Sequence, residues 1–227
     1  MAAPVSLSLQ HVPARRPSCR AVEDGTAARP VASSDCTEIS RALVDLVNGG
    51  GGMPSAARNT RVKSLIEQLE ARQEPLSGDA LRGPWEVVWS EGTMAWRALV
   101  ASCVQRLAGK CRAGQCFHPS AWTAMNFAEL FDKRITITAE GTFSPAEPTG
   151  RDSSDIAGVL CPVQFKVSIA EGALFYKNGD ADSKQCKLPI SGPGTFEILY
   201  GDSTVRIFRS SGGLAVQVPS DWKPPST

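Results

Sequence analysis

The last third of the sequence contains three short runs of alternating apolar residues, each bounded by turn residues. The runs cover residues 196–200, 205–207 and 214–218, and they are separated by Gly201-Asp202 and by Ser-Ser-Gly-Gly at 210–213. A period of two is typical of strands, and such short connections join antiparallel neighbours. A meander with one apolar face must close over a core. The feature therefore predicts a small barrel that is filled by side chains or by a small apolar ligand.

Composition excludes two classes of function. The chain has 227 residues, a hydrophobic fraction of 42% and a formal net charge of +1, which suits one soluble globular domain. No run approaches the roughly 18 apolar residues that a transmembrane helix needs. The basic residues are scattered, so a nucleic-acid partner is not expected.

The N-terminus differs from the rest of the chain. Residues 1–22 contain three arginines, several serines and alanines, and no acidic residue. They lack the continuous apolar segment of a secretory signal, so residues 1–34 are predicted to form a disordered organelle transit peptide. A tail without a targeting role is the alternative.

The cysteines and histidines do not predict a metal site. Cys111 and Cys116 lack the usual ligand spacing, and His118 is the single histidine outside the leader. We expect free thiols in a reducing compartment, no metal and no cofactor. A regulatory disulfide between Cys111 and Cys116 stays open. The seven cysteines are Cys19, Cys36, Cys103, Cys111, Cys116, Cys161 and Cys186.

Two amphipathic helices are expected over residues 35–76. Asp35 and Glu38 have the spacing of a capping box ahead of an apolar stripe that ends at a glycine run, residues 49–52. A second stripe spans about residues 56–72. Stripes of this width pack on their own domain or bind a membrane surface, and we expect the first.

The predicted barrel covers residues 81–222. The region 90–126 has no clear period: residues 94–107 could form a helix or an irregular strand, and residues 110–120 resemble a loop. Besides the terminal meander, strands are expected at 83–90, in the later half of 128–139, at 162–169 and at 174–176.

Two segments resemble a known family, the plastid lipid-associated proteins or fibrillins. The first is Leu-Arg-Gly-Pro-Trp-Glu-Val-Val-Trp-Ser at 81–90, and the second is Leu-Tyr-Gly-Asp-Ser-Thr-Val-Arg-Ile-Phe-Arg at 199–209. The helical pair is also similar to the family's N-terminal module. Residues 90–126 depart from the pattern.

The resemblance implies a mainly β (α+β) fold, a lipocalin-like antiparallel barrel preceded by two helices. It implies a plastid (chloroplast) protein, at thylakoids, plastoglobules or in the stroma, that binds a lipid, carotenoid or prenylquinone. A filled-barrel scaffold that coats lipid bodies or docks a partner enzyme is the alternative, and an enzyme acting on a carotenoid or quinone is a third. Because no catalytic constellation surrounds His118, no enzymatic activity is expected.

Two sets of residues are assigned from alternation and from the family motifs. The expected interior, which would contact a ligand, comprises Val87, Trp89, Ile135, Ile137, Phe165, Val167, Phe196, Ile198, Val205, Ile207, Val216 and Val218. The residues expected to close the barrel are Gly83, Trp85, Asp202, Arg206 and Arg209. One of the two arginines is predicted to lie over the Trp85 indole.

Overall fold

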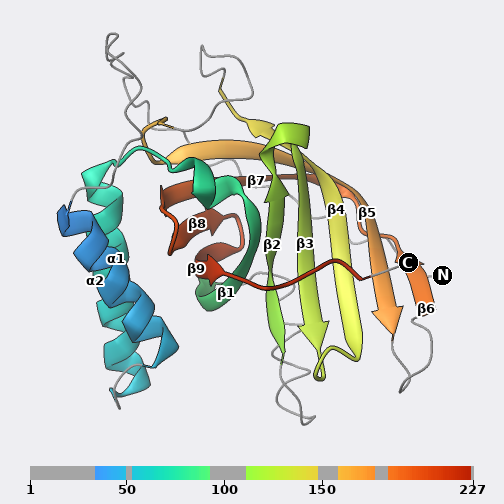
Figure 1. Ribbon diagram of the computed structural model, residues 1–227, viewed down its shortest axis with the longest axis horizontal. Helices are drawn as coiled ribbons and strands as arrows, with labels where there is room; N and C mark the ends of the chain where they lie inside the picture. The colour runs from blue at the N-terminus through green and yellow to red at the C-terminus, as the bar shows by residue number, and fades with distance from the viewer. Residues whose placement is uncertain (1–33, 50–52, 93–110, 148–157, 177–183, 226–227) are drawn as a thin grey trace.

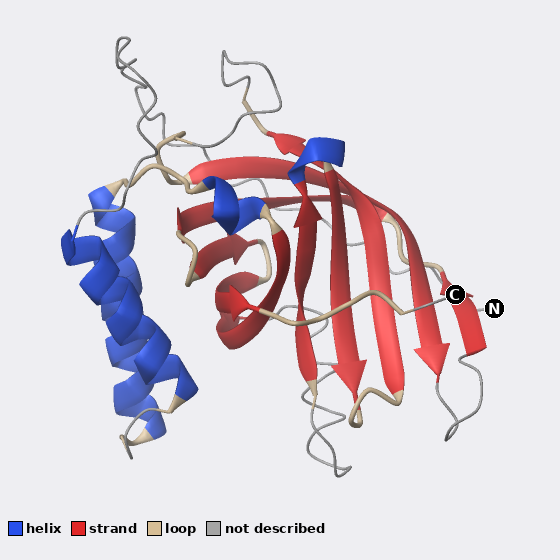
Figure 2. Cartoon of the chain, in the orientation of Figure 1, coloured by secondary structure: helices blue, strands red, loops and turns tan. Residues whose placement is uncertain are grey.

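The protein is a β-barrel with two helices packed against one side (Figures 1 and 2). This computed structural model describes residues 34–49, 53–92, 111–147, 158–176 and 184–225. Three sequence predictions fall outside these residues: the transit segment up to residue 33, the segment 94–107, and the thiols of Cys19 and Cys103.

Eight antiparallel strands form a closed barrel. Hydrogen-bonded neighbours follow the order β4-β3-β2-β1-β9-β8-β7-β5, and pairing of β4 with β5 closes the circle. A ninth strand, β6 (Lys184–Leu188), pairs with the second half of β5. The predicted lipocalin-like barrel is therefore confirmed. Its strands are β1 (Gly83–Gly92), β2 (Arg112–His118), β3 (Thr123–Leu130), β4 (Ile135–Pro145), β5 (Val163–Tyr176), β7 (Gly192–Gly201), β8 (Arg206–Ser210) and β9 (Gly213–Pro219).

The predicted C-terminal meander corresponds to β7, β8 and β9. The two strands expected at 162–169 and 174–176 form one continuous strand, β5. Its first half pairs with β7 and its second half with β6, while β4 follows it along almost its whole length. One long strand thus connects the circle to the added edge strand.

The prediction of a loop at residues 110–120 is wrong, because β2 occupies most of it, and β3 was not predicted. These two strands place small and polar residues on the inner face, including Ala113, Gln115 and Asn126, opposite apolar residues such as Phe127 on the outer face. Alternation of apolar and polar residues fails as a signal where the inner face contains amides.

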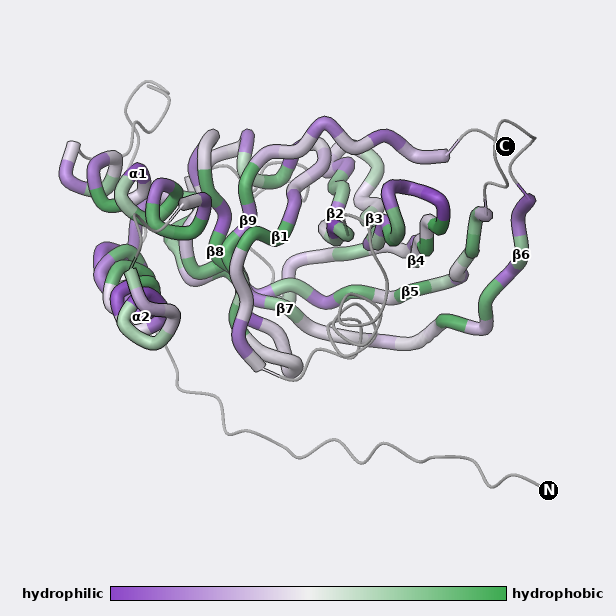
Figure 3. Tube along the Cα trace, turned by 90° about the horizontal axis from the view of Figure 1, so that it is seen from below, coloured by the Kyte–Doolittle hydropathy of each residue, from purple (hydrophilic) through white to green (hydrophobic). Residues whose placement is uncertain are grey.

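The two helices, α1 (Ser34–Asn48) and α2 (Ser55–Arg72), are confirmed. Helix α1 begins at Ser34, so Asp35 lies in its first turn. The apolar stripes of both helices pack on the outer face of β1, β7, β8 and β9, as expected, and do not face solvent. Figure 3 shows the helices beside β8 and β9, on the opposite side of the barrel from β6. No described helix is long and apolar enough to cross a membrane.

Candidate functional site

One end of the barrel interior is filled by aromatic side chains. The ring centroids of Phe117 and Phe143 are 5.1 Å apart, those of Phe143 and Phe165 are 5.8 Å apart, and Phe165 stacks on Phe196 at 5.0 Å. Trp122 packs against the ring of Phe143 at 5.1 Å. These contacts, at distances typical of stable aromatic pairs, leave this end of the barrel packed.

Seven of the predicted interior residues lie on the inner face. Five belong to the interior apolar cluster or pack against it: Val87, Phe165, Val167, Phe196 and Ile198. The other two, Ile135 and Ile137, share a face of β4 with the interior residue Phe143 because side chains alternate along a strand.

The other five predicted interior residues lie on the outer face, so that assignment is wrong for them. Four pack in or against the cluster between the sheet and the helices: Trp89, Val205, Ile207 and Val216. The fifth, Val218, follows Val216 on the same face of β9. The Trp89 indole N–H also donates to Asn59 Oδ1 of α2 at 3.0 Å.

Two features explain the error. The pairing register shifts between Val87 and Trp89 on β1, and between Ile198 and Tyr200 on β7, so each strand changes the face that its later residues occupy. In addition, the helices pack on the outer face of β8 and β9. On these two strands the outer face is therefore buried, and it is the more apolar of the two faces. A sequence pattern identifies an apolar face but does not say whether it points inward.

The inner face of β8 and β9 instead presents the polar residues Arg206 and Gln217, both fully buried. Arg206 Nε donates to Gln217 Oε1 at 2.7 Å, and its Nη1 donates to the carbonyl oxygen of Ala80 at 3.1 Å. Its guanidinium carbon lies 5.0 Å from the Trp85 ring centroid and 4.5 Å from that of Phe117. Its Nη2 donates to Gln115 Oε1 at 3.3 Å, so two aromatic rings and three oxygens hold this cation inside the barrel.

No carboxylate forms an ion pair with Arg206 in the described part of the chain. Removal from water disfavours the charged form and lowers the pKa of Arg206 to about 9. The side chain still has a positive charge at neutral pH. Among the residues that the structure describes, this buried charge is balanced only by dipoles and ring faces.

The residues predicted to close the barrel fall into two groups. Trp85 is buried on the inner face and its indole N–H donates to the carbonyl oxygen of Arg82 at 3.1 Å, while Gly83 starts β1 at φ +70°. Arg206 lies over Trp85 as predicted for one of the two arginines. Arg209 lies on the outer face and does not close the barrel.

Asp202 and Arg209 instead connect the barrel to the helices. Arg209 forms ion pairs with Glu70 of α2 at 3.0 Å and with Glu197 at 3.1 Å. Asp202 accepts hydrogen bonds within the β7–β8 turn and one from Ser40 of α1 at 2.8 Å. Neither side chain points toward the interior.

Some inward-facing side chains, both at the edge of the aromatic cluster and away from it, keep part of their surface exposed. Val87, Ile135, Ile137 and Val167 are only half-buried although they lie on the inner face. Asn126 is half-buried as well, and it lies on this face because it pairs with Gln115 two positions from the Phe117–Ala124 pair. This part of the interior combines apolar surface with the amides of Gln115 and Asn126.

The amides of Gln115, Asn126 and Gln217 were not predicted as interior residues. An interior position of Gln217 could have been predicted, because Gln217 lies between Val216 and Val218 in an otherwise apolar strand. A polar residue in such a strand usually has a buried partner. Gln115 and Asn126 had no such signal.

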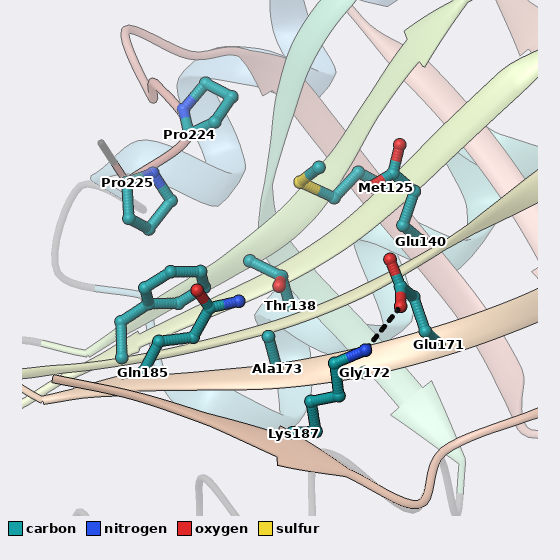
Figure 4. A pocket seen from close by; sticks show the side chains of 11 residues that line it. Met125, Thr138, Glu140, Glu171, Gly172, Ala173, Gln185, Lys187, Pro224 and Pro225 are labelled. Carbon is teal, nitrogen blue, oxygen red and sulfur yellow. Dashed lines mark ion pairs between the residues drawn. The ribbon is translucent and has the colours of Figure 1, made fainter. Parts of the chain in front are cut away.

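A groove of about 300 Å³ lies on the outer face, between the strands and the C-terminal segment (Figure 4). Prolines 224 and 225 face a floor from β3, β4, β5 and β6 that includes Met125 and Phe175. Glu140 and Glu171 are direct cross-strand partners at its edge, and Lys187 lies 4.0 Å from Glu171. None of the predicted ligand-contacting residues lines this groove.

A second, wider groove of about 460 Å³ lies beside Arg112. Arg112 forms ion pairs with Glu129, with Asp221 at 2.6 Å and with Glu86 at 3.6 Å. Hydrogen bonds to Asp221 and Glu129 raise its pKa, although burial opposes them. These contacts hold the C-terminal segment against β1, β2 and β3. They also pair the positive charge of Arg112 with carboxylates of the protein itself.

A disulfide between Cys111 and Cys116, the alternative to the expected free thiols, does not fit the strand. Both cysteines are free, and β2 starts directly after Cys111. Five residues of extended chain separate Cα atoms by roughly 16 Å, far beyond the reach of a disulfide. Cys116 Sγ instead lies 3.5 Å from His118 Nε2, and burial raises the pKa of its thiol.

Comparison with known proteins found no match to any family model, to any curated protein or to any solved structure. Within the described ranges, no group of three or more His, Cys, Asp or Glu residues could hold a metal ion.

Proposed function

We propose that this protein is a non-catalytic carrier of a hydrophobic small molecule, as its resemblance to the plastid lipid-associated proteins implies. The observation that supports the proposal most directly is the partly exposed inner face, where the apolar residues Ile135 and Ile137 share a face of the sheet with the Asn126 amide. Binding sites for small molecules are mainly apolar with a few orienting polar groups.

The chemistry of the inward polar groups favours holding a ligand over transforming it. In the described part of the chain, the hydrogen-bonded polar network of the interior consists of three amides and one guanidinium, from Gln115, Asn126, Gln217 and Arg206. Amides do not ionise near neutral pH, and a guanidinium whose pKa is about 9 stays charged there. Such groups orient a ligand but do not provide general acid–base catalysis.

The ligand class and the location follow from the resemblance and from the N-terminal composition. We infer a lipid, a carotenoid or a prenylquinone as ligand, and a plastid protein that associates peripherally with thylakoids or plastoglobules. The apolar stripes of α1 and α2 are buried against the barrel, so another surface would provide the peripheral association.

A scaffold function is the second candidate, and the aromatic cluster favours it. The rings of Phe117, Phe143, Phe165 and Phe196 fill one end of the barrel. If packing continued through the whole interior, the protein would act through its surface, for example by docking an enzyme or by coating a lipid body.

Native mass spectrometry of the protein lacking residues 1–33, followed by solvent extraction, separates the two functions. A stoichiometric apolar molecule, returned chemically unchanged after incubation, is expected for a carrier. A protein of unliganded mass that binds no added lipid, carotenoid or quinone would contradict the carrier function and favour the scaffold.

Two tryptophan substitutions on β4 test the location of binding. Ile137→Trp places an indole on the partly exposed inner face, and Thr142→Trp places one on the exposed outer face. We expect the first to abolish ligand retention with a loss of stability of about 1–3 kcal/mol, and the second to leave retention unchanged. Equal retention in both variants would exclude binding on this part of the inner face.

A further inference from the structure

A chain of hydrogen bonds runs from the buried cation to the partly exposed inner face. Arg206 Nη2 donates to Gln115 Oε1 at 3.3 Å, and Gln115 Nε2 in turn donates to Asn126 Oδ1 at 3.1 Å. Gln217 Nε2 also lies 3.4 Å from Gln115 Oε1. These linked hydrogen bonds lead from Arg206 on β8 to Gln115 on β2 and end at Asn126 on β3.

The direction of this chain is determined by Arg206. A guanidinium only donates hydrogen bonds, so the atom of Gln115 that faces it must be the carbonyl oxygen. The amide nitrogen of Gln115 then faces Asn126, which must present its own oxygen. Arg206 therefore leaves the NH₂ group of Asn126 at the end of the chain.

This NH₂ group is at a place where a ligand could meet it. Asn126 is half-buried, and its cross-strand partner on β4 is Ala139, on the same face as Ile135 and Ile137. Within the described ranges, no acceptor is hydrogen-bonded to Asn126 Nδ2. The interior thus offers polarised N–H donors beside apolar surface. The positive charge of Arg206 lies at the other end of these linked hydrogen bonds.

We infer that the barrel recognises its apolar ligand through an oxygen that only accepts hydrogen bonds, a carbonyl or a carboxylate, bound by the Asn126 side-chain amide. This inference rests on the proposed carrier function. A hydroxyl head would fit less well, because its own proton also needs an acceptor and Gln115 Oε1 already faces two donors. A cationic amine would be repelled by the Arg206 charge.

A series of ligands with one chain length and different heads tests the inference. Displacement of a polarity-sensitive fluorescent probe would be measured at pH 7 for a long-chain methyl ketone, the fatty acid, the alcohol, the amine and the alkane. We expect the ketone and the acid to bind about tenfold more tightly than the alkane, the alcohol to lie between them, and the amine to bind most weakly.

Substitutions at Asn126 identify the group responsible. Asn126→Leu should reduce the ketone-to-alkane affinity ratio to about one without loss of alkane binding. Asn126→Asp, nearly equal in size, should reverse the order of amine and acid, and it provides the test if the leucine variant does not fold. Met125→Leu, which changes the neighbouring outward side chain, is the matched control and should leave every ratio unchanged.

The outcomes separate the inference from the function on which it rests. Tight, head-independent binding of all five compounds, alkane included, would overturn the inference and leave the carrier function standing. Failure of every compound to displace the probe would overturn both. An acid-to-amine preference that persists in Asn126→Asp would show that another group selects the head.

Discussion

The hydroxyl of Ser40 donates a 2.8 Å hydrogen bond to the carboxylate of Asp202, 162 positions later in the chain. The same carboxylate accepts the Tyr200 hydroxyl at 2.9 Å and the backbone N–H groups of Thr204 and Val205 at 2.6 and 2.8 Å. One side chain thus joins helix α1 to the turn between β7 and β8. Asp202, which the sequence identifies as a turn residue, therefore also makes a tertiary contact.

Substitution of either partner of this hydrogen bond should destabilise the protein, and substitution of Asp202 should do so more strongly. Ser40→Ala should lower the free energy of unfolding by about 1 kcal/mol, and Asp202→Ala by about 3 kcal/mol, because it leaves several donors without an acceptor. Urea denaturation measures both. Ser203→Ala, on the exposed residue beside Asp202, is the control and should change stability by less than about 0.5 kcal/mol. Equal effects of all three would contradict the role of the carboxylate.

The two arginines of β8 should differ sharply in their effect on stability. Arg206→Lys removes a planar group held between Trp85 and Phe117 and should cost about 2–4 kcal/mol. Arg209→Lys affects a partly exposed ion pair with Glu70 and should cost less than about 1 kcal/mol. Thermal denaturation of the two variants makes the comparison, and a larger loss in Arg209→Lys would show that the outer ion pairs close the fold.

Stability should depend on pH through the buried thiol of Cys161. Burial, and secondarily Glu197, raise the pKa of this thiol from 9.0 to about 12. The unfolded chain loses the proton near pH 9 and the folded chain keeps it until about pH 12. The contribution of the neutral thiol is therefore complete below pH 9 and is lost as the pH rises toward 12.

Comparison with Cys161→Ala isolates this contribution. The stability advantage of the wild type over the variant should be constant below pH 9 and then fall by up to about 1.4 kcal/mol per pH unit. Urea denaturation under reducing conditions at pH 7.5, 9.5 and 10.5 measures it. Cys186→Ala, at an exposed thiol, is the matched control variant. A constant difference for Cys161→Ala across this range would refute the linkage.

The C-terminal segment should contribute to stability mainly through Trp222. Its indole stacks on the Phe127 ring at 4.2 Å with an angle of 4° between the planes, and it is buried. Trp222→Ala should cost about 3 kcal/mol. Trp222→Phe should cost less than 1 kcal/mol, because it keeps the stacking and removes a buried N–H that bonds to no described residue. Thermal denaturation distinguishes the two, and equal losses would mean that stacking is not the main contribution.

Much of the architecture could be predicted from local patterns. The stripe containing Val62, Leu65 and Ile66 predicted α2, and the alternation after Gly194 predicted the three-strand meander, because each depends on periodicity within one element. Strands β2 and β3 escaped prediction because their inner faces hold Ala113, Gln115 and Asn126. Periodicity is informative only where the buried face is also the apolar one.

The candidate site was predictable only in part. Ile137, Phe165 and Val167 follow the alternation and lie inside, whereas Ile207 and Val216 follow it equally well and lie under the helices. The difference comes from two register shifts and from packing of α1 and α2 on the outer face. Neither is encoded in the spacing of apolar residues.

The sequence by itself determined that the chain forms an antiparallel barrel with two helices before it, since local periodicity and turn residues are properties of neighbouring positions. The tertiary structure decided which face of each strand points inward, and so placed Arg206 rather than Val205 or Ile207 inside the barrel. The physical reason is that both faces of a sheet are buried where helices cover its outer face, so apolar residues can occupy either face. Only the packing of distant segments determines which face encloses the site.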